Sequence, residues 1–257
     1  MNQKVFRKVL SAAAITLTLT ACQSAGPKEE AAAAADSPAT ETSKPSAPAI
    51  PNAVIAAPEF YKTLKDTAGI RMVEAIYKPG DSSVMHSHHD YAVYTIAGGK
   101  AEFTMPDGTK DVREMTAGVA RVLAGDAHSV KNIGNTTMKV ILVEVDRPQA
   151  ITPVDAAMDA TKVAGDLYKV KADSLGIRVL EATYKPGQSS VMHAHPWQAV
   201  YPLTNASGEF TTKDGQKMPV EMKPGEVMIV APTSHAVKNV GKAAMKVLIV
   251  EVSRSEK

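Results

Sequence analysis

One block of this chain occurs twice, and this duplication limits the folds open to the chain more than any other feature. Residues 59–147 align with residues 166–254 at a constant offset of 107 (166 − 59 = 107), without a gap. From residue 70 onward about half of the positions are identical in the two copies. A repeat of this length is too long for a solenoid and is typical of a small domain copied whole. The sequence therefore predicts two domains of one fold, with a joint over residues 148–165.

Histidine is the residue type that the duplication preserves best. Six of the seven histidines recur at matched positions, and only His89 lacks a counterpart. The matched pairs are His86 and His193, His88 and His195, and His128 and His235. Several imidazoles at fixed spacing are typical of a transition-metal site. The sequence therefore predicts such a site in each copy.

Each copy consists of short β-type runs separated by turn signals. In the first copy these runs cover residues 70–77, 92–96, 100–105, 119–123 and 139–145. Strands of five to eight residues between Gly, Pro and Asp-Gly turns are typical of an all-β sandwich or barrel. The one expected helix, residues 154–164, lies in the joint between the copies.

Strand geometry brings the histidines together. Side chains alternate between the two faces of a strand, so His86 and His88 point the same way. His128 comes from a later strand or from the mouth of the barrel. Three imidazoles from two strands form a three-point site that leaves coordination positions open.

Residues 1–21 are typical of an export signal. Lys4, Arg7 and Lys8 precede an apolar stretch over residues 9–19, which is far shorter than the ~20 residues that span a bilayer. Without these three charges the net charge of +2 becomes about −1 (2 − 3 = −1). No basic patch remains that would indicate binding to nucleic acid.

The end of this signal resembles a bacterial lipobox. The segment Leu19-Thr20-Ala21-Cys22 contains the only cysteine of the chain. The resemblance implies lipidation of Cys22, and Gln23 implies sorting to the outer membrane, with the protein facing the periplasm. The alternative is a soluble secreted protein with a chance cysteine. Residues 22–58 are rich in Ala, Ser, Pro and Thr and are expected to be a disordered tether.

The histidine pattern resembles that of the cupin superfamily. Its first motif has a glycine, His-x-His and a later glycine, which match Gly80, His86, His88 and Gly99. Its second motif ends in a histidine and an asparagine, which match His128 with Asn132 and His235 with Asn239. The resemblance covers both repeats. It implies two tandem antiparallel jelly-roll barrels of six to eight strands each, a bicupin.

One departure from the family pattern changes the expected chemistry. The position of a glutamate ligand in the first motif holds Ala92 in one copy and Ala199 in the other. Bicupin oxalate decarboxylases keep this glutamate, which argues against that specific activity. Cupins with three histidines form a class that includes dioxygenases.

All-nitrogen ligation suits Zn, Cu, Fe or Ni. An ion that keeps its full +2 charge favours a small anionic or enolic ligand. For a protein of this kind, the resemblance to cupins implies a metal-dependent oxygenase or isomerase.

Other residues recur or stand out near the motifs. Tyr94 and Tyr201 are candidate catalytic residues, as proton donors near the ion. Asp90 is a candidate for orienting a ligand or for an extra ligand, and Trp197 for a pocket wall. The recurring pairs Glu102 and Glu209, Glu144 and Glu251, and Lys131 and Lys238 are expected on solvated strand faces, without a chemical role.

Two other classes of function fit the same sequence. One is a non-catalytic lipoprotein that binds small molecules, or that is purely structural, and uses the barrels without metal. The other is a metal-free sugar epimerase, with His86 or His128 and Tyr94 as acid and base. Pairing of barrels within one chain or across an oligomer is left open.

Overall fold

The computed structural model describes residues 49–151 and 155–256. The predicted signal 1–21, Cys22 and most of the predicted tether lie outside the described residues. Within the described part, no helix combines the length and the apolar character needed to cross a membrane.

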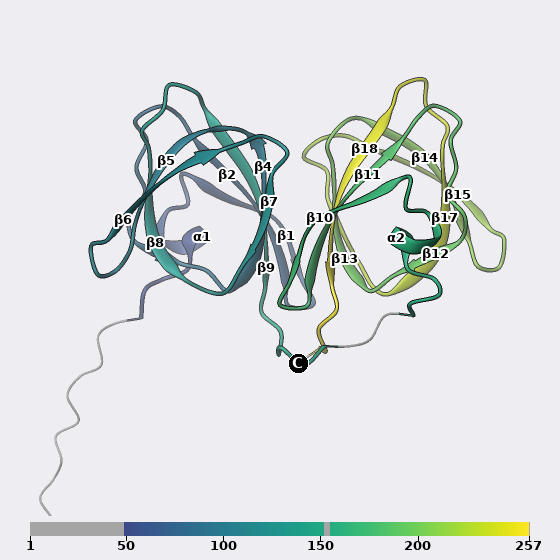
Figure 1. The fold of residues 1–257 in the computed structure, drawn as a ribbon, viewed down its shortest axis with the longest axis horizontal. Coiled ribbons are helices and arrows are strands. Elements are labelled where there is room, and N and C mark those ends of the chain that lie inside the picture. The colour runs from purple at the N-terminus through teal and green to yellow at the C-terminus, as the bar shows by residue number, and fades with distance from the viewer. Residues whose placement is uncertain (1–48, 152–154, 257) are drawn as a thin grey trace, which may run out of the picture. The chain divides into compact units, whose positions relative to one another are not determined.

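Each repeat folds into two antiparallel sheets, as the turn-separated strands predict (Figure 1). The first repeat contains α1 (Ala53–Ala56), β1 (Tyr61–Thr67), β2 (Ile70–Tyr77), β3 (His86–Ser87), β4 (Asp90–Ala97), β5 (Gly99–Thr104), β6 (Lys110–Met115), β7 (Ala120–Leu123), β8 (Ala127–Asn132) and β9 (Met138–Val145). The second repeat contains α2 (Ala160–Val163), β10 (Tyr168–Ser174), β11 (Ile177–Tyr184), β12 (His193–His195), β13 (Trp197–Pro202), β14 (Ala206–Thr212), β15 (Lys217–Met222), β16 (Met228–Val230), β17 (Thr233–Asn239) and β18 (Met245–Val252).

The strand order is the same in both repeats. A sheet of order β1-β2-β9-β4-β7 packs on one of order β3-β8-β5-β6, and the second repeat has β10-β11-β18-β13-β16 on β12-β17-β14-β15. The prediction of an all-β fold made of two tandem barrels is confirmed.

Both faces of the larger sheet of each repeat are buried. On β2, Val73 and Tyr77 point into the barrel core, whereas Ile70 and Met72 belong to a second cluster. This second cluster, called here the inter-repeat core, takes seven fully matched residues from each repeat: Ile70, Met72, Ala92, Tyr94, Ile141, Val143 and Val145 with Ile177, Val179, Ala199, Tyr201, Leu248, Val250 and Val252. The larger sheets therefore stabilise each other as well as their own barrels.

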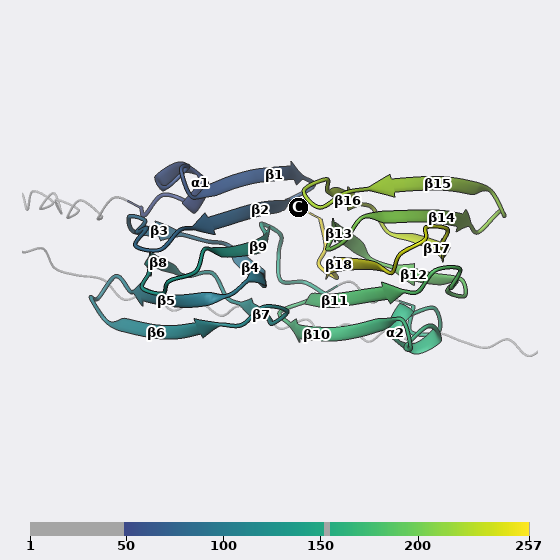
Figure 2. The same ribbon diagram turned by 90° about the horizontal axis from the view of Figure 1, so that it is seen from above.

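A one-turn helix precedes the first strand of each repeat (Figure 2). Asn52 caps α1 and Asp159 caps α2, at the same offset of 107 (159 − 52 = 107). Ala53 and Ala57 are buried in the barrel core because their small side chains let the helix approach the strands closely. The packed fold therefore begins before the predicted start at residue 59. The helix expected over residues 154–164 is limited to α2.

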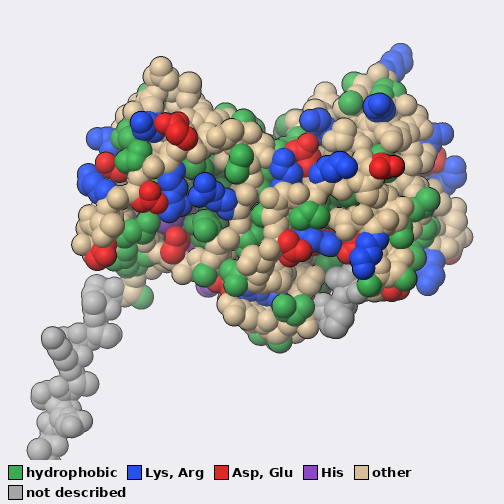
Figure 3. Space-filling view, in the orientation of Figure 1, with side chains coloured by type: hydrophobic (Ala, Val, Ile, Leu, Met, Phe, Trp, Pro, Cys, Tyr) green, Lys and Arg blue, Asp and Glu red, His purple; other side chains and the backbone are tan. Residues whose placement is uncertain are grey.

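The surface carries mixed charge. Lys and Arg side chains alternate with Asp and Glu over the face shown in Figure 3. Both signs of charge therefore occur on this face.

Candidate metal centre

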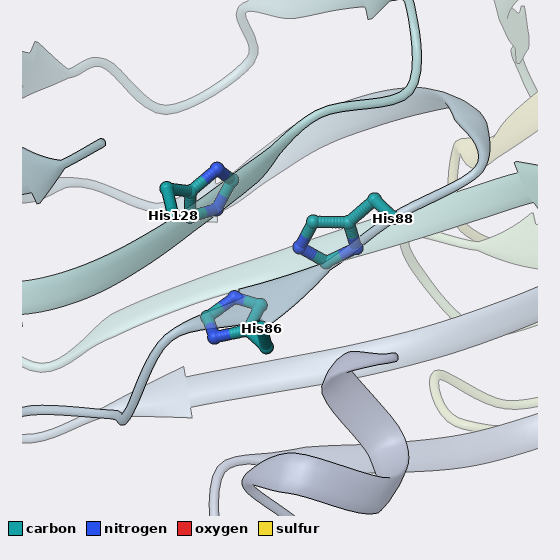
Figure 4. Close-up of side chains that lie close together, drawn as sticks. All are labelled: His86, His88 and His128. Carbon is teal, nitrogen blue, oxygen red and sulfur yellow. The ribbon is translucent and has the colours of Figure 1, made fainter. Parts of the chain in front are cut away.

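The three histidines of the first repeat converge inside its barrel. His86 on β3 lies opposite His128 on β8 in the strand register, and His88 follows two residues later. The centroid of the His86 ring is 5.0 Å from that of the His88 ring and 4.9 Å from that of the His128 ring. One nitrogen of each ring lies within 4.8 Å of the others, and the three rings face a common space (Figure 4). The predicted residues are thus brought together.

The second repeat reproduces this arrangement. His193 on β12 lies opposite His235 on β17, with ring centroids 4.7 Å apart. His195 lies 4.9 Å from His193 by the same measure, and the three nitrogens again lie within 4.8 Å of one another. All six histidines are buried, at 0–8% exposure.

Hydrogen bonds on the outer nitrogens fix the tautomers of four of the rings. His86 Nδ1 lies 2.8 Å from the Val84 carbonyl oxygen, and His88 Nδ1 lies 2.7 Å from Glu144 Oε1. The matching distances for His193 and His195 are 2.8 Å and 2.6 Å. Because a carbonyl and a carboxylate only accept, each Nδ1 carries the proton and each Nε2 carries a lone pair.

Two of these Nε2 atoms have no partner at all. His88 Nε2 and His195 Nε2 are buried and make no hydrogen bond to the described residues. A buried acceptor left in this way costs free energy, about 1–3 kcal/mol, unless something binds to it. The histidine triads are thus pre-oriented donor sets that fit a metal ion.

Glu144 and Glu251 hold His88 and His195 in place, contrary to their expected position on a solvated face. They are 2% and 1% exposed. Arg71 Nε donates to Glu144 at 2.8 Å, and Arg178 Nε donates to Glu251 at 2.6 Å. Burial alone would raise the pKa of Glu144, but hydrogen bonds and charge from His88 and Arg71 outweigh it and lower this pKa. The Glu144 carboxylate therefore stays charged. Both carboxylates orient an imidazole, as outer carboxylates do in metal sites.

A sequence signal for these carboxylates existed. Each glutamate interrupts an otherwise apolar run, residues 140–145 of β9 or residues 247–252 of β18, and recurs with an arginine at the same offset. A lone charge in an apolar run that also has a matched partner of opposite sign indicates a buried pair rather than a solvated face.

Two further tyrosines lie at the triads and were not singled out from the sequence. The Tyr61 hydroxyl is 3.0 Å from His86 Nε2, and the Tyr168 hydroxyl is 2.8 Å from His193 Nε2. Burial raises the pKa of both hydroxyls well above the ordinary value, so both stay protonated and donate. An ion on these Nε2 atoms must displace the hydroxyl or take it as a neighbour.

Burial also keeps three of the histidines, His86, His193 and His235, neutral. It lowers the pKa of His86 and of His193 to about 4, and that of His235 to about 3. Neutral imidazole is the form that binds a metal ion.

The predicted catalytic candidates Tyr94 and Tyr201 lie elsewhere. Both are part of the inter-repeat core, and the Tyr94 hydroxyl donates to Glu181 of the second repeat at 2.9 Å. They point out of the barrels because they stand on the outer face of β4 and β13. Ala92 and Ala199 face the same way, whereas Val93 and Val200 line the barrel cavities. The motif therefore places an apolar side chain, and no carboxylate, both at the position of the glutamate and at the next position, which faces the cavity.

Asp90 and Trp197 also have structural partners. Asp90 accepts from Arg254 at 2.8 Å and from the Gly125 amide at 2.8 Å, so it links the repeats and does not orient a ligand. The Trp197 ring stacks under the Arg147 guanidinium at 4.7 Å. It also lines an outer cleft of about 700 Å³ that includes His195, in agreement with the expected pocket wall.

Each barrel encloses a cavity. The two cavities differ in volume, and matched positions in their linings hold different residues. The cavity of the first barrel has a volume of about 70 Å³ and is lined by Arg113 and Arg121. The cavity of the second barrel has a volume of about 260 Å³, with Val220 and Met228 at those positions. The first triad also has a carboxylate beside it, since Asp126 Oδ2 is 3.4 Å from His128 Nδ1. The triads are therefore alike, but their surroundings are not.

Comparison with known proteins identifies the fold class. Residues 180–251 match the family model Cupin_2, which describes a cupin domain. The second repeat is therefore a cupin domain, and two equivalent barrels in tandem give the chain the bicupin fold. The match to the family model thus covers the second repeat, and the first repeat shares its fold through the same strand order.

Solved structures share this fold at low sequence identity. A variant of oxalate decarboxylase from Bacillus subtilis aligns at a TM-score of 0.55 and 16% identity, over 77% of this chain and 73% of that chain. A structure of that enzyme concerned with its Mn(II) centres aligns at 0.52 and 14%, over 77% and 73%. AerE from Microcystis aeruginosa aligns at 0.52 and 13%, over 76% of this chain and 99% of that chain. No curated protein sequence matches the chain.

Proposed function

We propose that this chain is a bicupin that binds one divalent transition-metal ion in each histidine triad and presents the first ion to a small anionic or enolic ligand. In this proposal the protein is a metal-dependent oxygenase or isomerase. The observation that carries it is the pair of buried, unpartnered Nε2 atoms on His88 and His195, whose opposite nitrogens are fixed by carboxylates. Imidazoles oriented by a carboxylate are typical of metal ligands.

The donor set favours particular metals. Each triad offers three neutral nitrogens, which suit Zn, Cu, Fe or Ni. Manganese, named for oxalate decarboxylase, prefers oxygen ligands, and the nearest carboxylates, Glu144 and Glu251, are held on the far nitrogens of His88 and His195. An ion with three neutral ligands would supply an undiluted positive charge to a bound anion or water.

The first barrel supports an anionic ligand. Arg113 and Arg121 line its cavity together with His88 and His128. Arg113 stacks on Phe103 at 4.8 Å and pairs with Asp111, so its guanidinium is held in position at the cavity. A guanidinium recognises a carboxylate or an enolate through charge and paired hydrogen bonds.

Visible spectroscopy of cobalt-loaded protein tests this function. We expect formate to change the cobalt absorption bands of the wild type, and we expect Arg113→Met with Arg121→Met to weaken formate binding about tenfold or more. Cobalt bands that do not respond to formate would contradict a ligand-accepting metal centre. The remaining interpretation would then be a non-catalytic cupin.

The location of the protein is part of the same proposal. Cys22 follows a lipobox-like segment, and we propose that it carries a lipid that anchors the chain at the outer membrane, facing the periplasm. Fractionation tests this directly. Wild-type protein is expected with the outer membrane, and Cys22→Ala is expected to lose this membrane association; equal membrane association of both would contradict the anchor.

A further inference from the structure

The cavity of the second barrel has its own chemistry, although its positions match those of the first. Val220 and Met228 stand where the first barrel has Arg113 and Arg121. Met218 stands at the position of Asp111, the ion-pair partner of Arg113. The second repeat has thus exchanged a charged cluster at the cavity for an apolar one.

We infer that the second barrel binds an uncharged, mainly apolar small molecule about the size of a substituted benzene ring. This inference goes beyond the proposed function, which assigns an anion to the first barrel. It also holds whether or not the triad carries a metal ion, because it rests on the lining of the cavity.

The size of the cavity sets the size of the ligand. Its volume of about 260 Å³ compares with about 70 Å³ in the first barrel. An engineered apolar cavity of about 150 Å³ stays dry and binds benzene. The second barrel therefore has room for one ring with substituents.

The lining sets the polarity of the ligand. Four methionines, Met218, Met222, Met228 and Met245, contribute to the walls. Methionine is apolar and adapts its shape to the ligand that it contacts. A charged group among such walls would lose its hydration without a compensating partner.

The lining of the cavity also holds a few polar side chains that can satisfy one polar group of a ligand. Gln198 lines it at 3% exposure, and its side-chain amide takes part in none of the hydrogen bonds among the described residues. Thr233 and His235 line the cavity as well. In the first barrel the position of Gln198 holds Tyr91, which lines the cavity there. The geometry thus favours a ligand with an apolar body and one hydroxyl or carbonyl group.

Isothermal titration calorimetry with two matched probes tests the inference on the whole chain. The probes are 4-tert-butylbenzyl alcohol and 4-tert-butylbenzoate, which share an apolar body and differ in charge. Both are titrated after treatment with a chelator, so that a carboxylate cannot bind through a metal ion. We expect the alcohol to bind one site per chain and the benzoate to bind about tenfold more weakly or not at all.

A variant with the residues of the first barrel locates the site. Val220→Arg with Met228→Arg is expected to weaken binding of the alcohol at least about tenfold. The matched control, Val170→Arg with Val240→Arg, adds the same charge at positions 50% and 51% exposed and is expected to bind as the wild type does. If the cavity variant does not fold, the comparison of the two probes on the wild type still tests whether the site prefers an uncharged ligand.

Three results would overturn the inference: no binding of the alcohol, equal binding of both probes, or unchanged binding by the folded cavity variant. Failure of the proposed metal function is seen separately, as a loss of metal binding with the alcohol still bound. Conversely, metal binding without alcohol binding would contradict only this inference.

Discussion

At the scale of single residues, the contact made by the outer nitrogen of each imidazole decides what its inner nitrogen can do. His88 and His195 are each held by a buried carboxylate, and each carboxylate is held in turn by an arginine. The chain from Arg71 through Glu144 to His88 therefore fixes both the position and the tautomer of a ligand.

Removing the charge of one carboxylate tests this chain of contacts. Glu144→Gln leaves a hydrogen-bonding group but removes the negative charge from His88 and Arg71. We expect metal affinity at the first triad to fall about 10–100-fold and the free energy of unfolding to fall by about 1–3 kcal/mol. Competition titration and urea unfolding measure the two effects. Glu114→Gln, on a side chain that is 72% exposed, is the control and is expected to change neither.

Stability of the metal-free protein should depend on pH through the buried histidines. Burial lowers the pKa of His86 and His193 from 6.5 to about 4 and that of His235 to about 3. Below pH 6.5 the unfolded chain therefore binds protons that the folded chain does not. Stability is full above pH 6.5 and falls toward pH 4, by up to about 1.4 kcal/mol per pH unit for each histidine.

Urea midpoints between pH 7.5 and 4 measure this dependence. A midpoint that stays constant over this range would contradict neutral, buried triads. The same series on a variant with His86 and His193 replaced by Gln is expected to be flatter.

The residue scale also explains which site residues the sequence could reveal. Recurrence of six histidines sufficed to predict both triads. Recurrence of Tyr94 and Tyr201 did not show which way they point, because both faces of β4 and β13 are buried. On such strands, alternation of polar and apolar residues no longer separates the inside of a barrel from the outside.

At the scale of elements, the last residue of β8 and of β17, the asparagine of the second motif, links neighbouring elements of its barrel by hydrogen bonds. Asn132 Nδ2 donates to the Tyr77 and Thr136 carbonyl oxygens at 2.9 Å and 2.8 Å, and its Oδ1 accepts from the Gly134 amide at 3.0 Å. Asn239 makes the matching bonds in the second repeat. One side chain thus ties the end of β2 to the loop after β8.

Replacing this asparagine tests its structural role. Asn132→Ala leaves buried carbonyl and amide groups without partners, and we expect the free energy of unfolding to fall by about 2–3 kcal/mol. Metal stoichiometry is expected to stay unchanged in the folded variant. Urea unfolding gives the measurement, with the exposed Asn135→Ala as control. Equal stability of both variants would show that the asparagine does not hold the elements together.

Whether a strand could be predicted from the sequence depended on whether it is apolar. The apolar runs at residues 70–77 and 139–145 correspond to β2 and β9, in the middle of the larger sheet. β1 and β6 were missed because they are polar edge strands, with mostly exposed side chains on β1 and exposed or half-buried ones on β6. Charged edge strands protect a sheet from pairing with other chains, and the same charges hide them from hydrophobic patterning.

At the scale of the whole described molecule, the inter-repeat core joins the two barrels. It contains matched residues from both larger sheets, and polar contacts surround it. Arg254 pairs with Asp90 of the first repeat at 2.8 Å, and Arg147 stacks on Trp197 of the second. The sequence predicted two domains. It could not show that the apolar residues on the outer faces of the larger sheets pack against the other repeat.

Because the barrels share this core, we expect them to unfold together. Trp197 is the only tryptophan, so its fluorescence reports on the second repeat and on the contact of this ring with Arg147, whereas far-ultraviolet circular dichroism reports on both repeats. The two urea transitions are expected to coincide. Two separated transitions, with fluorescence following only one, would contradict a shared core.

The metal content of the purified protein tests the central claim most directly. Elemental mass spectrometry of the wild type, after reconstitution with zinc, copper, iron or nickel, is compared with a His88→Ala and His195→Ala variant. The account predicts about one ion per triad in the wild type and a loss of this binding in the folded variant. A wild type that binds no transition metal, or a variant that binds as much as the wild type, would contradict it.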